Sequence, residues 1–98
     1  MKIWLDDIRK PPDSTWDWAT DEEEFKDCFL MGEFVQEISF DNDLGACEKE
    51  GWELARWVLD RVVDGHITAP DRMYCHSMNP VARQRIEATI RDVEKHRS

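Results

Sequence analysis

Long apolar runs, paired cysteines and flexible linkers are all missing from this 98-residue sequence. No stretch approaches the roughly 20 apolar residues needed to cross a bilayer, and the first seven residues already include two aspartates, unlike a secretory signal. The three cysteines, Cys28, Cys47 and Cys75, are odd in number and lack Cys-x-x-Cys spacing, which argues against a disulfide scaffold or a zinc site. We therefore expect one cytoplasmic domain over residues 1–98, with no membrane partner.

Basic residues are also scarce. Thirteen lysines and arginines face 22 aspartates and glutamates, which gives a net charge of −9. Residues 1–71 contain seven basic and nineteen acidic residues, whereas residues 72–98 contain six basic and three acidic ones. An acidic surface argues against binding to double-stranded DNA, which requires positive charge. It remains compatible with a small phosphorylated ligand held by a metal ion on the acidic part and by arginines on the basic part.

Hydrophobic patterning predicts alternating strands and helices. Strands are predicted over residues 2–5, 16–19, 37–40 and 72–76. A helix is predicted after Thr20, as N-cap with Glu23 in a capping box, a second from Trp52, and a third from Asn79-Pro80. The expected buried stripe of the last helix is Ala82, Ile86, Ile90 and Val93. This order predicts an α/β fold: a small open parallel sheet of about four strands with covering helices. No aromatic stacking platform is apparent.

Polar residues follow three of the predicted strands, as Asp6-Asp7, Asp41-Asn42-Asp43 and His76-Ser77. The carboxyl ends of parallel strands meet at one edge of the sheet, where ligands bind in open α/β folds. Asp6, Asp7 and Asp41 are therefore predicted to hold Mg²⁺ or Mn²⁺, although solvated loop acids are the alternative for the first pair. Asp43 has two interpretations, a catalytic role or a cap for the following turn.

The third cluster suggests proton transfer and phosphate binding. His76 titrates near neutrality and is a candidate general acid or base, while a purely structural histidine is the alternative. Ser77 and Asn79 precede a predicted helix N-terminus, which favours phosphate, and both residues also suit helix capping. Arg83, one turn into that helix, and Arg9 complete the predicted phosphate-binding set. The predicted catalytic residues are Asp41, Asp43 and His76.

Three segments together resemble a known family. Leu5-Asp6-Asp7-Ile8-Arg9, then residues 38–45 (ISFDNDLG), then His76-Ser77-Met78-Asn79-Pro80 are similar to motifs of the small cyclic-phosphate processing receiver-like domains. The resemblance covers nearly the whole chain, and it implies a truncated, flavodoxin-like receiver fold. It further implies hydrolysis of cyclic phosphates such as those on RNA ends. By resemblance to receivers, Asp6 and Asp7 match the metal-binding pair, Asp41 the phosphorylated acid, and Ser77 the hydroxyl that contacts the phosphoryl group.

The sequence departs from these patterns at two points. No fifth strand with its lysine is evident, so ordinary phosphorelay signalling is not expected. The family usually has histidine between the two acids of the third-strand motif, whereas this chain has Asn42. The leading prediction is a metal-dependent phosphoesterase acting on a cyclic phosphate of a nucleotide or RNA end. The alternative is a non-enzymatic receiver-like module that binds a protein or nucleotide through the same acidic edge.

Overall fold

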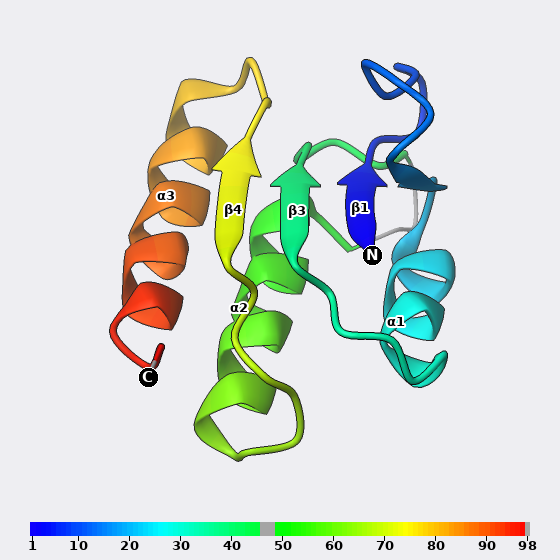
Figure 1. Ribbon diagram of the computed structural model, residues 1–98. Helices are drawn as coiled ribbons and strands as arrows, with labels where there is room; N and C mark the ends of the chain where they lie inside the picture. The colour runs from blue at the N-terminus through cyan, green and yellow to red at the C-terminus, as the bar shows by residue number, and fades with distance from the viewer. Residues whose placement is uncertain (46–48, 98) are drawn as a thin grey trace.

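A four-stranded parallel sheet organises the computed structural model, which describes residues 1–45 and 49–97 (Figure 1). Its strands are β1 (Lys2–Leu5), β2 (Asp17–Ala19), β3 (Glu37–Phe40) and β4 (Arg72–Cys75), in the order β2-β1-β3-β4. The helices are α1 (Glu22–Leu30), α2 (Gly51–Val63) and α3 (Pro80–Glu94). The predicted α/β receiver-like fold is confirmed, and the described residues form no fifth strand.

All three helices bury side chains against the same side of the sheet. Phe25 of α1, Leu54 of α2 and Ile86 of α3 join one hydrophobic cluster with Ile38 and Phe40 of β3. In Figure 1 the helices lie behind or beside the strands, and the face of the sheet toward the viewer carries no helix. Parallel sheets usually have both faces covered, so this face is an unusual surface.

The order of the strands explains why one face is bare. The chain passes from β2 to β3 through α1 and from β3 to β4 through α2, and both steps run in the same direction across the sheet. Since such crossovers are right-handed, both helices must lie on the same face. The only step in the opposite direction, from β1 to β2, uses the segment 6–16, which contains no helix. Among residues 1–45 and 49–97, no helical crossover therefore covers the second face.

The N-cap of α3 is the residue predicted from the sequence, whereas the N-cap of α1 lies one residue after the predicted one. The Asn79 side chain accepts hydrogen bonds from the backbone N–H groups of Val81 and Ala82, as predicted for an N-cap. The N-cap of α1 is Asp21, whose carboxylate accepts the N–H of Glu24, so the prediction of Thr20 was wrong. Thr20 instead donates its own backbone N–H to the Glu24 carboxylate. The predicted stripe of α3 is buried: Ala82, Ile86, Ile90 and Val93.

The structure describes two of the three cysteines and all three helices. Cys28 and Cys75 are free thiols, and Cys47 lies outside the described residues. Within residues 1–45 and 49–97, none of the helices combines the length and apolar character needed to cross a membrane.

Candidate functional site

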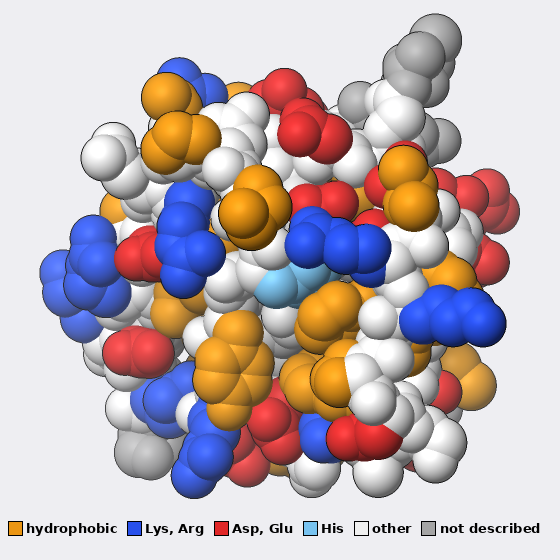
Figure 2. All heavy atoms as spheres, turned by 90° about the horizontal axis from the view of Figure 1, so that it is seen from above, with side chains coloured by type: hydrophobic (Ala, Val, Ile, Leu, Met, Phe, Trp, Pro, Cys, Tyr) orange, Lys and Arg blue, Asp and Glu red, His pale blue; other side chains and the backbone are white. Residues whose placement is uncertain are grey.

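Asp6, Asp41 and His76 meet at the carboxyl edge of the sheet, where β1, β3 and β4 end. One ligand atom from each of the three side chains lies within 4.8 Å of the others. Asp6 and Asp41 flank the point at which the strand order reverses, between β1 and β3. Figure 2 looks down on this edge and shows acidic and basic side chains next to a histidine. The structure therefore brings residues that follow three different strands together at this edge.

Asp6 is buried and fully engaged by its neighbours. Its Oδ1 accepts the backbone N–H groups of Ile8 (2.9 Å) and Arg9 (2.8 Å). Its Oδ2 lies 3.1 Å from both Arg9 Nε and His76 Nε2. Burial acts to raise the pKa of Asp6, but these hydrogen bonds and the Arg9 charge outweigh it and hold the pKa below its usual value. Asp6 is therefore ionised at neutral pH and anchors the segment that follows β1.

The pKa of Asp41 is shifted in the opposite direction, above its usual value. Burial is the main cause that raises its pKa, and the charges of Asp6 and Asp43 add to it. Arg9 opposes them only in part, with Nη2 3.4 Å from Asp41 Oδ1. Arg9 Nη2 also donates to the backbone oxygen of His76 at 3.3 Å, so this arginine connects the ends of β1, β3 and β4. Asp41 thus carries negative charge that its surroundings do not fully compensate.

His76 is held on three sides. Its Nδ1 lies 2.7 Å from the Ser39 hydroxyl and its Nε2 3.1 Å from Asp6 Oδ2. Its ring stacks on the Trp4 indole, with centroids 3.9 Å apart and planes at 4°. Burial lowers the pKa of His76 below its usual 6.5, and the Asp6 hydrogen bond opposes this shift only partly. The ring is therefore neutral at pH 7, with the Nε2 proton donated to Asp6 and Nδ1 accepting the Ser39 hydroxyl.

A cavity of about 330 Å³ opens directly beside these groups. Four of its lining residues are acids, namely Asp6, Asp7, Asp41 and Asp43, and Arg9 and Ser77 line it as well. The Asp7 carboxylate has no hydrogen-bond partner among residues 1–45 and 49–97. The cavity therefore combines carboxylate oxygens, a guanidinium group and a buried hydroxyl.

The predicted phosphate-binding residues do not all face this cavity. Ser77 and Asn79 line it, but the Asn79 carboxamide already accepts the first free N–H groups of α3. Ser77 Oγ accepts the backbone N–H of Asn79 at 3.2 Å, which leaves the hydroxyl proton for another acceptor. Arg83 lines a separate groove between β4 and α3, where its Nε donates to Glu87 at 2.7 Å. Its Nη1 reaches the Ser77 backbone oxygen at 3.5 Å.

Asn42 has a structural role that the sequence analysis missed. Its side-chain oxygen accepts the N–H of Trp52 at 3.2 Å, and its backbone oxygen accepts the N–H of Gly51 at 2.8 Å. Its Nδ2 donates to Asp43 at 3.3 Å. Asn42 therefore ties the start of α2 to the end of β3, beside Asp41. Asp43, which the sequence offered as an alternative cap, is exposed at the cavity, and Glu50 is the N-cap of α2.

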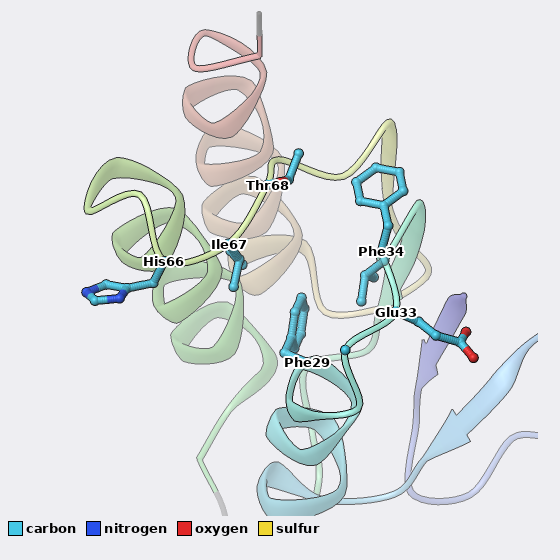
Figure 3. A pocket seen from close by; sticks show the side chains of 8 residues that line it. Phe29, Glu33, Phe34, His66, Ile67 and Thr68 are labelled. Carbon is cyan, nitrogen blue, oxygen red and sulfur yellow. The ribbon is translucent and has the colours of Figure 1, made fainter.

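A second cavity, of about 280 Å³, lies at the opposite edge of the sheet (Figure 3). The rings of Phe29 and Phe34 and the Ile67 side chain point into it, whereas Glu33 and His66 point away toward solvent. Its two ionisable side chains thus point away from the cavity, so it is a poorer candidate for chemistry.

Comparison with known proteins agrees with this geometry. Residues 1–92 match the family described as the cyclic-phosphate processing receiver domain. No curated protein and no solved structure shows significant similarity to the chain. The match spans every strand and nearly all of α3, and it includes each residue that lines the acidic cavity. The chain therefore belongs to the cyclic-phosphate processing receiver domain family.

Proposed function

We propose that this protein is a metal-dependent phosphoesterase that hydrolyses a cyclic phosphate on a nucleotide or an RNA end. The cavity at the carboxyl edge carries the proposal, because Asp7, Asp41 and Asp43 line it together with Arg9 and Ser77. Carboxylates suit a hard cation, and guanidinium and hydroxyl groups suit phosphoryl oxygens. Family membership supports a cyclic phosphate as the reacting group.

The donor set fits a divalent cation. Asp41 has a raised pKa because of burial and the charges of Asp6 and Asp43, and a cation would relieve that repulsion. Asp7 and Asp41 would hold Mg²⁺ or Mn²⁺, with Asp6 fixing the segment that presents Asp7. When bound, such a cation supplies positive charge for the phosphoryl oxygens and lowers the pKa of water.

The remaining chemistry is proton transfer. Hydrolysis joins the oxygen of water to phosphorus and breaks one ring P–O bond, so the water loses a proton and the leaving oxygen gains one. Asp43, exposed at the cavity, is our candidate to accept the proton from water. His76 is our candidate donor in its protonated form, which the Asp6 carboxylate stabilises through Nε2–H and which burial makes the minor form at pH 7.

Turnover assays test this proposal. We would measure release of a linear monophosphate from nucleotides and RNA ends that carry a cyclic phosphate, with and without Mg²⁺ or Mn²⁺. The wild type should require the metal ion, and His76→Ala should lower turnover roughly 10²–10⁴-fold. Arg56→Ala, a change at an exposed position of α2, should leave turnover intact and serves as the matched control. Undiminished activity in His76→Ala would remove this residue from the reaction.

Asn42 supports one alternative. An amide does not transfer protons as imidazole does, and the Asn42 side chain already contacts Trp52 N–H and Asp43. A non-enzymatic receiver-like module would bind a nucleotide or a protein through the same edge without turning it over. Absence of metal-dependent turnover on every cyclic phosphate in the assay, with binding retained, would favour this second function.

A further inference from the structure

The helix-free face of the sheet carries a row of aromatic side chains. The strand register places Trp18 of β2, Trp4 of β1, Ser39 of β3 and Tyr74 of β4 side by side. We call Trp18, Trp4 and Tyr74 the aromatic row. Trp18 is 39% exposed and Tyr74 41% exposed. Large exposed aromatics on a face that no described helix covers indicate a binding surface.

The aromatic row is continuous with the acidic cavity. Asp6, Asp41 and His76 lie two residues beyond Trp4, Ser39 and Tyr74, which is a rise of about 6.6 Å along the strands. The aromatic row and the residues at the sheet edge are in contact, because the His76 ring stacks on Trp4. In Figure 2, hydrophobic side chains gather next to the histidine on the side that faces the viewer in Figure 1. A ligand with its phosphate in the cavity can therefore lay a flat group on the row.

The rings of the row are fixed before any ligand arrives. Trp18 Nε1 donates to the Asp6 backbone oxygen at 2.6 Å, and Trp4 Nε1 donates to that of Arg9 at 2.9 Å. Trp16 packs edge-on against Trp4, with centroids 5.8 Å apart. Rings that are already ordered bind a partner with little further loss of side-chain entropy.

Cations flank the row in an otherwise acidic protein. Lys2 and Arg72 lie two residues before Trp4 and Tyr74 on the same face, on either side of Glu37, which accepts the Tyr74 hydroxyl. Beside Tyr74, a groove of about 310 Å³ between β4 and α3 is lined by Arg83 and Arg91. These groups suit the phosphates of a nucleic acid strand.

We infer that the aromatic row is a base-binding subsite, on which a single-stranded RNA end stacks its bases while its terminal cyclic phosphate enters the acidic cavity. This inference rests on the proposed function and adds the part of the substrate that the cavity does not hold. Stacking on aromatic rings tolerates any base, so the subsite selects single strands over duplexes rather than a sequence.

Binding of a labelled oligoribonucleotide tests the subsite without turnover. The probe ends in a linear phosphate, and its affinity is read from fluorescence anisotropy. Tyr74→Ala and Trp18→Ala should each weaken binding roughly 5- to 150-fold, whereas Tyr74→Phe should bind like the wild type. Phe34→Ala, which removes an equally exposed ring at the opposite edge, is the matched control and should have no effect. A base-free ribose phosphate should bind all variants equally.

Two outcomes would overturn the inference. Equal oligonucleotide affinity in the wild type, Tyr74→Ala and Trp18→Ala would exclude base stacking on this face. Concentration-dependent dimerisation that Tyr74→Ala abolishes, with oligonucleotide binding unchanged, would assign the face to a second copy. The hydrolase proposal is tested separately. If the protein shows no turnover but its RNA binding still depends on Tyr74, the hydrolase proposal is wrong and the base-binding subsite stands. If the enzyme is active but its RNA affinity does not depend on Tyr74, the subsite is wrong and the hydrolase proposal stands.

Discussion

Replacing Gly51 with alanine should disrupt the acidic cavity from outside it. Gly51 is the first residue of α2, and its N–H donates to the Asn42 backbone oxygen at 2.8 Å. A Cβ at this position would lie 1.7 Å from the Asp41 backbone oxygen and 2.9 Å from Asn42 Cα. These atoms belong to the backbone, so no flexible side chain can move aside. Since ordinary contacts are about 3.5–4.0 Å, α2 and the end of β3 would have to separate by well over 1 Å.

Two opposing effects determine how much Gly51→Ala changes the free energy of unfolding. Alanine normally stabilises a helix by about 0.5–1 kcal/mol relative to glycine. Overpacking costs about 1–3 kcal/mol or more, and a lost Gly51–Asn42 hydrogen bond adds about 1 kcal/mol. We expect a net loss of roughly 1–3 kcal/mol in the free energy of unfolding, or a Tm drop of about 4–8 °C for each kcal/mol. Because Asp41 moves with this segment, turnover should fall by about 10²-fold.

Urea denaturation and the cyclic-phosphate assay measure both effects. Gly65→Ala is the control: its φ of 79° is unfavourable for alanine, yet a Cβ there meets no atom within 4 Å. It should cost about 1–2 kcal/mol from backbone strain and leave turnover per folded molecule unchanged. A Gly51→Ala protein that is more stable than the wild type and fully active would refute the described contact between α2 and β3.

Further predictions concern the core and the charge of the cavity. Ile86→Ala, at a fully buried position, should lower the free energy of unfolding by about 2–5 kcal/mol. Arg91→Ala, at an exposed position, should lower it by less than about 0.5 kcal/mol. If urea titrations rank the two variants in the opposite order, the buried and exposed faces of α3 are misassigned. Millimolar Mg²⁺ or Mn²⁺ should raise the Tm of the wild type but not of Asp41→Asn, and an unshifted wild type would count against the metal site. Without metal at pH 7, Asp41→Asn should be the more stable protein, because burial and the charges of Asp6 and Asp43 raise the pKa of Asp41. This difference should appear as pH rises through the folded-state pKa and vanish below about 3.9, where Asp41 is protonated in both states; a wild type with the higher Tm at pH 7 would contradict it.

Local patterns predicted the strands and the edge at which the polar groups meet. Residues 2–5 and 37–40 are short apolar segments that end in acids, and parallel pairing then brings Asp6 and Asp41 to one edge. The Asn79-Pro80 helix start was equally direct, because each residue favours a single helix position. At α1 the pattern was ambiguous: Thr20 and Asp21 are both good caps, and acids stand three residues after each.

The remaining features depend on contacts between distant segments. Asn42 caps α2 from ten residues away, and the spacing of its neighbours gives no sign of this hydrogen bond. The aromatic row was missed because Trp18, Trp4 and Tyr74 come from three strands and share a face only through the register. The row is exposed because the β2-to-β3 and β3-to-β4 crossovers have the same handedness and direction, and because the β1-to-β2 connection contains no helix. Amino-acid composition does not reveal either feature.

The central position of β1 also has a consequence for synthesis. β1 is made first, yet it pairs with β2 on one side and β3 on the other, so its second partner is complete only once residue 40 has been added. Asp6 then reaches its imidazole partner across 70 residues. A nascent chain that stops before β4 has all four acids of the cavity but neither His76 nor the buried Met73. Since parallel pairing over long separations folds slowly, the candidate site becomes complete in the same late step that closes the core, and a half-made chain cannot display it.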